Sequence, residues 1–228
     1  MNSEHATLAA ARQRIEAAAR AAGTPSVALV AASKTRPAAT LRAFAAAGQH
    51  AFGENYVAEA RAKQAELPDL ALEWHAIGPL QSNKCAEVAR HFDWLQSLDR
   101  PKLVPLLARA RPAERGPLNV LVQVNIDHEA SKSGCQPAAL PALAEAVAAE
   151  SALRLRGIMA IPAPWPDTDR RRRAFAALRA LFEALRRDHP AIDTLSMGMS
   201  DDHLLAIAEG ATMVRLGTTL FGPRPRRE

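Results

Sequence analysis

Eight short apolar segments alternate with helical patterns along almost the whole chain, and this alternation constrains the fold most. The expected strands are residues 27–33, 50–53, 73–77, 94–98, 118–125, 155–161, 194–197 and 213–216. The clearest helical pattern, over residues 170–188, places apolar side chains at three- and four-residue spacing. Eight strand–helix repeats predict a (β/α)8 barrel, the TIM barrel, which belongs to the α/β class. An open doubly wound sheet is the alternative, although no Gly-x-Gly-x-x-Gly turn follows the first strand.

The N-terminal segment adds one helix in front of this alternation. Residues 4–22 are rich in alanine, and Leu8, Ile15 and Ala18 lie on one side of the expected helix. The other expected helices span residues 38–47, 56–66, 84–90, 101–110, 137–150 and 201–209. No low-complexity linker interrupts the 228 residues, so we expect a single domain over residues 1–228 with a substantial core.

The composition indicates in which cellular compartment the chain is expected to work. Hydrophobic residues make up 48% of the chain, yet no apolar run is long enough to cross a bilayer. The N-terminus lacks the pattern of a secretory signal, and Cys85 and Cys135 form neither a disulfide framework nor a zinc motif. We therefore expect a soluble, cytoplasmic protein with no metal site and no association with membranes.

The net charge of +5 raises nucleic-acid binding as one function class. Lys and Arg are scattered, however, and the one dense run, residues 169–173, opens an amphipathic helix whose basic side is expected to face solvent. Aromatic residues make up only 4% of the chain, which leaves little for stacking on bases. We expect no nucleic-acid partner, and a mildly basic protein also suits a small phosphorylated ligand.

A lysine stands where the first apolar segment gives way to a loop. Lys34 follows the run Val-Ala-Leu-Val-Ala-Ala-Ser and precedes Thr35. Loss of hydration at the end of a buried strand disfavours the ammonium form, and a neutral amine is a nucleophile toward an aldehyde such as that of pyridoxal phosphate (PLP). The alternative is a lysine that only extends to solvent from the rim of a barrel.

The last two expected strands end in residues that suit an anion. Arg215 lies inside a short apolar strand, where a charge needs a partner, and Gly217 and Thr218 follow with backbone N–H groups and a hydroxyl. The loop after the seventh strand adds Ser200 as an expected helix N-cap, while Asp201 and Asp202 in the first turn would repel a phosphate. In a TIM barrel these two loops form the usual phosphate site. An ordinary capped helix followed by a tight turn explains the same residues.

Three further polar residues lie at expected strand ends, each with two interpretations. His75 is either a general base or a core histidine with satisfied hydrogen bonds, and Asn55 either positions a ligand or caps a helix. Lys132, in Ser-Lys-Ser-Gly after the fifth strand, either meets an anion or is a solvated loop lysine.

These segments, taken together and in order, resemble the pyridoxal phosphate homeostasis protein family, whose barrel is similar to the N-terminal barrel of alanine racemase. The matching pieces run from about residue 8 to residue 222 and lie at residues 32–35, 52–56, 74–84, 125–134, 156–161, 195–202 and 213–222. Each piece is weak alone, whereas the ordered set is highly specific.

The resemblance implies PLP bound as a Schiff base on Lys34. By the same analogy, Arg215 faces the pyridine nitrogen, while Ser200, Gly217 and Thr218 hold the phosphate. Asn55 and His75 are expected near the cofactor. Lys132 matches a family lysine near the site, and no role is assigned to it.

The resemblance leaves two functions to weigh, a PLP carrier and a slow amino-acid racemase or related PLP enzyme. An arginine cannot accept a proton, so the ring nitrogen it faces stays unprotonated and the ring is a weaker electron sink. Alanine racemases use a lysine and a tyrosine as two bases, the tyrosine coming from a second domain that we expect to be absent here. We therefore expect a monomeric protein of PLP homeostasis that buffers or delivers the cofactor, with other B6 vitamers and PLP-dependent apoenzymes as further partners.

Overall fold

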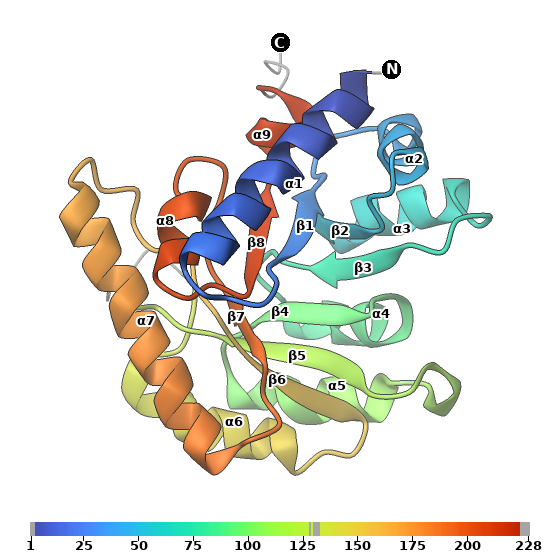
Figure 1. Cartoon of the computed structure of the whole chain (residues 1–228). Helices are drawn as coiled ribbons and strands as arrows, with labels where there is room; N and C mark the ends of the chain where they lie inside the picture. Colours follow the sequence, from blue (N-terminus) through green and yellow to red (C-terminus); the bar gives the residue numbers. More distant parts are fainter. Residues whose placement is uncertain (1–2, 128, 130–132, 224–228) are drawn as a thin grey trace.

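Eight parallel strands close into a barrel in the computed structural model, which describes residues 3–127, 129 and 133–223 (Figure 1). Each strand pairs with the next one along the chain, and the last pairs back onto the first. The strands are β1 (Ala28–Ala32), β2 (Ala51–Glu54), β3 (Glu73–Ala76), β4 (Trp94–Leu98), β5 (Leu118–Gln123), β6 (Leu153–Met159), β7 (Thr194–Ser196) and β8 (Met213–Leu216). The predicted TIM barrel is confirmed, and the open doubly wound sheet is excluded.

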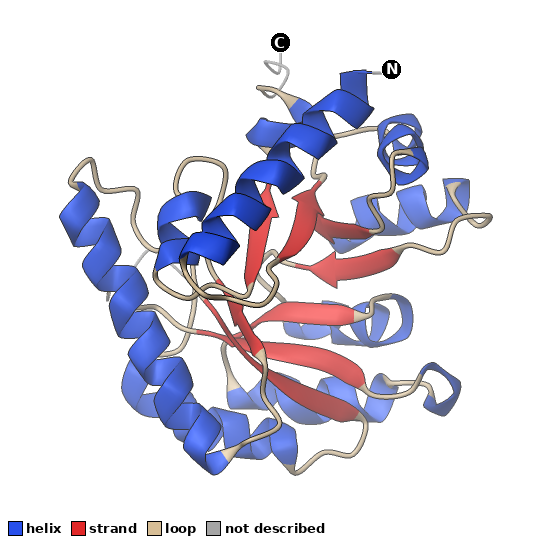
Figure 2. Ribbon diagram, viewed as in Figure 1, coloured by secondary structure: helices blue, strands red, loops and turns tan. Residues whose placement is uncertain are grey.

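Helices surround the barrel on the outside (Figure 2). They are α1 (Ser3–Ala21), α2 (Ala38–Ala46), α3 (Val57–Glu66), α4 (Cys85–His91), α5 (Val104–Ala110), α6 (Leu140–Ala148), α7 (Thr168–Asp188), α8 (His203–Ala208) and α9 (Thr218–Phe221). Short 3-10 turns precede α4, α5 and α6. The expected N-terminal helix is α1, which contacts α2, α8 and α9. Among the helices of the described residues, none combines the length and the apolar character that a membrane span requires.

The strands bury apolar residues on both faces, because each strand of a closed barrel faces an interior and a layer of helices. Alternate residues such as Ala31, Phe52 and Leu95 belong to the large core between the barrel and the helices. A smaller, separate cluster consists of Val30, Trp94, Leu121, Met159 and Met213. Polar residues on the same inward-facing positions continue this interior toward the carboxyl ends of the strands, where the loops carry the expected site.

One glycine explains an irregularity in the barrel. The register between β5 and β6 shifts after Val120, which pairs with Leu155, while Leu121 pairs with Gly157. Gly157 has a φ of +142°, which L side chains rarely adopt, and a Cβ there would collide with the carbonyl oxygen of Thr194. The bulge therefore requires glycine at this position.

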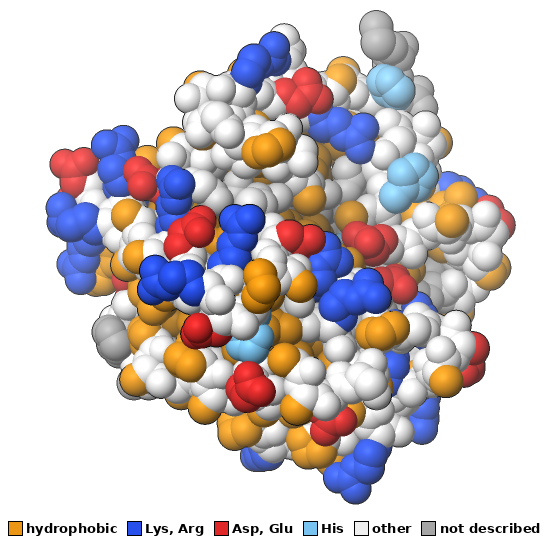
Figure 3. Space-filling view, turned by 60° about the horizontal axis from the view of Figure 1, so that its bottom comes forward, with side chains coloured by type: hydrophobic (Ala, Val, Ile, Leu, Met, Phe, Trp, Pro, Cys, Tyr) orange, Lys and Arg blue, Asp and Glu red, His pale blue; other side chains and the backbone are white. Residues whose placement is uncertain are grey.

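The basic run at the start of α7 is mostly exposed to solvent, as predicted, and some of its arginines contact neighbouring side chains. The guanidinium of Arg170 lies 3.3 Å from the centre of the Trp165 ring, and Arg172 lies 3.4 Å from Glu209. Asp167 caps the helix by accepting hydrogen bonds from the backbone N–H groups of Asp169 and Arg170. On the face of the molecule in Figure 3, Lys and Arg side chains are interspersed with Asp and Glu rather than gathered in one patch.

Candidate functional site at the carboxyl ends of the strands

The loop after β1 and the loop after β8 form one small pocket. Lys34 is partly buried, and it lines this pocket together with Ala32, Arg36, Gly217, Thr218, Phe221 and Gly222. Because β1 and β8 are neighbours in the closed barrel, residues about 180 positions apart in the sequence meet here. Arg36 ties the two loops together by donating hydrogen bonds to the carbonyl oxygens of Gly222, at 2.7 Å, and Pro223, at 2.9 Å. Three of the predicted site residues therefore lie together.

A buried ion cluster holds the backbone on both sides of Lys34. The ammonium of Lys63 in α3 donates to the Ser33 carbonyl at 2.9 Å, to Glu54 at 2.5 Å and to Glu59 at 2.7 Å. Glu59 also accepts from the N–H of Thr35 at 2.5 Å. Thr35 has a φ of +65°, a left-handed conformation that costs a threonine free energy unless its surroundings impose it. The cluster thus fixes the direction in which Lys34 leaves the strand.

Burial sets the charge balance of this cluster. Desolvation raises the pKa of Glu54, and the nearby Lys63 ammonium and the Ser33 hydroxyl counteract that effect in part. The Ser33 hydroxyl donates to Glu54 Oε1 at 2.6 Å. Removal of the Lys63 charge would leave the Glu54 carboxylate buried without a cation, whereas Lys63 would keep Glu59 if Glu54 were removed.

Arg215, the predicted cation of the last strand, points into the barrel interior and is 4% exposed. Its Nη1 donates to the Ser196 hydroxyl at 2.5 Å, and its Nη2 donates to the carbonyl oxygen of Ala160 at 2.9 Å. Burial lowers the pKa of Arg215 to about 10, with Asp202 acting in the opposite direction, so the guanidinium keeps its charge at neutral pH. The charge that the sequence placed in an apolar strand is therefore accommodated by neutral acceptors.

Two backbone N–H groups converge on one oxygen beside this pocket. The N–H groups of Gly217 and Thr219 both donate to the Ser200 hydroxyl, each at 3.2 Å. Convergent backbone donors of this kind also suit the oxygen atoms of an anion. The arrangement brings Ser200 to Gly217 and Thr218, as the sequence predicted.

The prediction that Ser200 caps the following helix is wrong. α8 begins only at His203, and Ser200 lies in the turn before it. Asp202 folds this turn, since its Oδ1 accepts from the N–H of Met199 at 2.7 Å. The local hydrogen bond to Asp202 competes with helix formation, which is why the helix starts later than residue 201.

Asn55 lies at the rim of the barrel, whereas His75 lies inside it. Asn55 follows β2 at the carboxyl end of the barrel, partly buried, and its backbone packs so closely on Gly78 that a Cβ on Gly78 would collide with it. His75 is fully buried inside the barrel, 5.3 Å from the Trp94 ring in a stacked arrangement. Both of its ring nitrogens have partners, Glu73 and Gln96. The interpretation of His75 as a core histidine with satisfied hydrogen bonds therefore describes its surroundings.

The two cysteines are not among the residues that line this pocket. Lys132 lies outside the described residues. Cys85 and Cys135 are buried free thiols, and burial raises the pKa of Cys135 to about 11. Within residues 3–127, 129 and 133–223, no group of His, Cys, Asp and Glu side chains could hold a metal ion.

Sequence reasoning missed the residues that support the site from behind. No role was predicted from the sequence for Lys63 and Glu59 in the expected helix 56–66, nor for Glu54, Gln96 and Ser196. A signal was present in each case. Lys63 occupies the same side of α3 as the buried Ala60, and Gln96 and Ser196 interrupt apolar strands. A polar side chain at a buried position needs a partner, and that requirement marks such residues.

The barrel and the pocket at its rim define a class of protein, the barrels of the alanine racemase N-terminal type. The family model described as alanine racemase, N-terminal domain, matches residues 6–225. The chain is 56% identical over 213 residues to the pyridoxal phosphate homeostasis protein of Pseudomonas aeruginosa PAO1, covering 92% of this chain and 91% of that one. It is 49% identical over 229 residues to the protein of that name from Escherichia coli K12, covering 98% of both.

A solved structure agrees with these relatives. PipY of Synechococcus elongatus PCC7942, determined with PLP bound, superposes with a TM-score of 0.86 and 39% identity, covering 96% of this chain and all of that one. The chain therefore belongs to the pyridoxal phosphate homeostasis protein family. The family predicted from the sequence is confirmed, and the predicted cofactor is the ligand named for PipY.

Proposed function

We propose that this chain binds PLP as a Schiff base on Lys34 and serves PLP homeostasis by buffering or delivering the cofactor. It would do so in the cytoplasm as a monomer of one domain, residues 1–228, with other B6 vitamers and PLP-dependent apoenzymes as further partners. The observation that carries the proposal is that the partly buried Lys34 lines one pocket with Gly217 and Thr218, which follow the buried Arg215 at the end of β8.

The described residues fit each part of PLP. Lys34 offers an amine at the rim, and the N–H groups that converge on the Ser200 hydroxyl offer donors to a phosphate. Arg215 offers a permanent donor to the ring nitrogen. Asn55 and His75 are also proposed to lie near the cofactor. His75 would act on it through the residues that it contacts. When bound, PLP supplies an aldehyde for the lysine and an aromatic ring that can withdraw electrons.

Two observations favour a carrier over a racemase. Tyr56 is the single tyrosine of the chain, and it is 62% exposed at the start of α3. Because the Tyr56 side chain extends into water, it is not held against one face of a bound ligand. Tyr56 therefore does not provide a second base in a fixed position. Arg215 keeps its proton and therefore favours an unprotonated ring nitrogen, which makes PLP a weaker electron sink.

Borohydride reduction followed by peptide mass mapping tests the covalent bond to Lys34. Reduction makes a Schiff base permanent, so we expect a pyridoxyl group on the peptide that contains Lys34 in the PLP-loaded protein. Lys34→Ala should lose this label, and Lys84→Ala should keep it, because Lys84 is a partly exposed lysine paired with Glu87.

Two outcomes would contradict the proposal. A label spread evenly over surface lysines, or one unchanged in Lys34→Ala, would reduce Lys34 to a lysine at the barrel rim. Racemisation of an amino acid that disappears in Lys34→Ala would replace the carrier function with an enzymatic one. Transfer of PLP to an apoenzyme, measured as recovered activity of that enzyme, would support delivery as distinct from storage.

A further inference from the structure

A continuous chain of hydrogen bonds crosses the barrel interior from Arg215 to Glu73. Arg215 Nη1 lies 2.5 Å from the Ser196 hydroxyl, which lies 2.7 Å from Gln96 Oε1. Gln96 Nε2 lies 2.9 Å from His75 Nδ1, and His75 Nε2 lies 2.8 Å from Glu73 Oε1. Ser196, Gln96 and His75 are fully buried. Four strands, β8, β7, β4 and β3, therefore contribute to one polar path.

Simple donor and acceptor rules give this path a direction. A guanidinium only donates, so the Ser196 hydroxyl accepts from Arg215 and uses its own hydrogen for Gln96 Oε1. The amide of Gln96 then presents its NH₂ to His75 Nδ1, which must be an unprotonated acceptor. The proton of the neutral imidazole is consequently on Nε2, where it is donated to Glu73.

The opposite orientation of the path is much less favourable. If the Gln96 amide turned around, the Ser196 oxygen would face two donors, and its own hydrogen would lose Gln96 as an acceptor. His75 would then need protons on both nitrogens, next to the fully buried Gln96 and under the Trp94 ring. The path therefore has one ground state, in which every donor points away from Arg215.

This direction helps a buried cation. Among the described residues, no carboxylate forms an ion pair with Arg215, and its two contacts are to a hydroxyl and a carbonyl oxygen. Instead, the Ser196 hydroxyl and the Gln96 amide turn their oxygen atoms toward Arg215. Through His75, the hydrogen-bonded path ends at the carboxylate of Glu73, the first residue of β3. The hydrogen bond from His75 is the main cause of the lowered pKa of Glu73, so this carboxylate is charged at neutral pH.

We propose that Gln96 is the positioning residue for Arg215 and that Ser196 and His75 act with it. Gln96 holds the Ser196 oxygen toward the guanidinium, so that Arg215 keeps one orientation and meets PLP as a donor. Loss of Gln96 frees Ser196 to turn and Arg215 to move. This inference rests on the proposed function, because it assumes that PLP binds beside Arg215.

The substitution Gln96→Met tests the proposal, because methionine keeps the size of the side chain and removes the hydrogen bonds to Ser196 and His75. We expect PLP to bind at least about tenfold more weakly, which is about 1.4 kcal/mol, and the visible absorption maximum of bound PLP to shift. Ser196→Ala should have the same effects, and Ser196→Thr, which keeps the hydroxyl, should restore the spectrum. Unchanged affinity and an unchanged spectrum in both Gln96→Met and Ser196→Ala would overturn the proposal.

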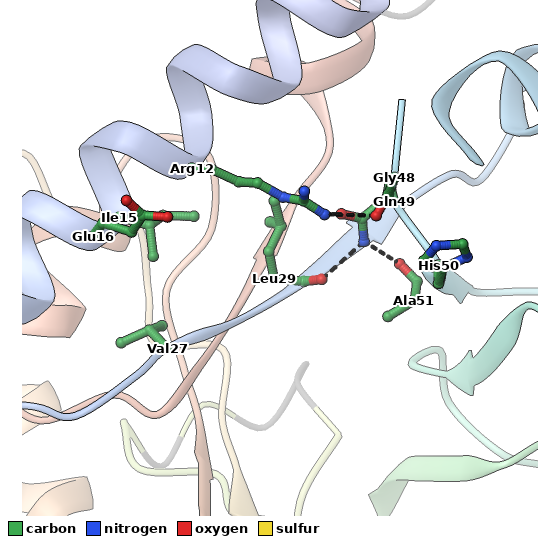
Figure 4. Close-up of a pocket in the computed structure, with 9 residues that line it drawn as sticks. All are labelled: Arg12, Ile15, Glu16, Val27, Leu29, Gly48, Gln49, His50 and Ala51. Atoms are coloured by element: carbon green, nitrogen blue, oxygen red, sulfur yellow. Dashed lines mark hydrogen bonds between the residues drawn. The ribbon is translucent and has the colours of Figure 1, made fainter. Parts of the chain in front are cut away.

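Gln49 provides the matched control, since it is also a buried glutamine. It lies at the opposite end of the barrel beside a cavity of about 400 Å³, where its Nε2 donates to the carbonyl oxygens of Leu29 and Ala51 (Figure 4). Arg12 from α1 donates to the carbonyl oxygen of Gly48 in the same place. Gln49→Met should lower the unfolding temperature and leave the PLP spectrum unchanged, which separates lost stability from lost positioning.

Nitrogen NMR of the His75 ring gives a second test that needs no cofactor. In the protein without PLP, we expect the tautomer with the proton on Nε2, and Gln96→Met should change the Nδ1 shift. Observation of the Nδ1–H tautomer would overturn the direction of the path even if a variant failed to fold. Failure of the proposed function would instead be seen as loss of specific labelling at Lys34, so the two failures are distinguishable.

Discussion

Individual side chains at buried positions decide how the candidate site is held. Lys63 is a charged residue on the inner side of α3, with two carboxylates and a backbone carbonyl within hydrogen-bond distance. The sequence indicates Lys34 because that lysine follows an apolar segment. The partners of Lys63 outside its own helix, Glu54 and the Ser33 carbonyl, could not be predicted, because they come from the ends of β1 and β2, and their approach depends on the barrel register. Distance along the chain carries no information about such contacts.

Lys63→Met should destabilise the protein by about 3–5 kcal/mol, because Glu54 is left buried without its cation. Urea unfolding measures this change. The double variant Glu54→Gln with Lys63→Met should lose less than Lys63→Met alone, since the uncompensated charge is then gone. Additive losses would show that the two side chains do not act as a pair.

Both cysteines should resist modification in the folded protein. Burial raises the pKa of Cys135 to about 11 and also raises that of Cys85, and the thiolate is the reactive form. We expect slow alkylation by iodoacetamide near neutral pH and rapid alkylation of both thiols after unfolding. Rapid labelling of the native protein, followed by mass spectrometry, would argue against a buried, protonated thiol at either position.

At the scale of elements, the strands could be predicted, because strands of a closed barrel are buried on both faces and are therefore short segments made mostly of apolar residues. The expected segment 94–98 coincides with β4, and 213–216 coincides with β8. Helix starts were less predictable, as the late start of α8 shows, because the local bond from Met199 to Asp202 competes with the helix. The exceptions to apolar patterning, Gln96 and Ser196, turn out to form the polar path beneath Arg215.

Gly157→Ala tests the bulge that sets the register between β5 and β6. The substitution meets both an unfavourable φ and a collision with Thr194, so we expect a loss of at least about 2 kcal/mol in the free energy of unfolding. Gly23→Ala is the control, because Gly23, which follows α1, also has a positive φ, +68°, but open space around it. That variant should lose about 1 kcal/mol. Equal losses would mean that the collision is relieved elsewhere.

At the scale of the whole molecule, α1 completes the packing around β1 and β8. Its buried side is formed by Leu8, Ala11, Ile15 and Ala19, and it lies against α2, α8 and α9. The helical pattern of this segment was predicted from its sequence. The position at which α1 packs could not be predicted, because the same apolar side would fit many grooves. That position depends on the arrangement of the neighbouring helices.

Ile15→Ala should lower the free energy of unfolding by about 2–5 kcal/mol, since a buried side chain is truncated and leaves a cavity. Glu16→Ala, at the exposed neighbouring position, should change it by less than about 0.5 kcal/mol. Chemical unfolding monitored by tryptophan fluorescence gives both values. Similar small losses in the two variants would indicate that α1 contributes little to the stability of the barrel.

The pairing of β1 with β8 has a consequence for synthesis of the chain. Lys34 leaves the ribosome well before Arg215, Gly217 and Thr218, which follow it by about 180 residues. A partly synthesised chain can expose the lysine but cannot provide the arginine or the N–H groups that converge on Ser200. The pocket comes into existence only when β8 inserts between β7 and β1. Acquisition of a ligand there would therefore report that the ring of strands has closed.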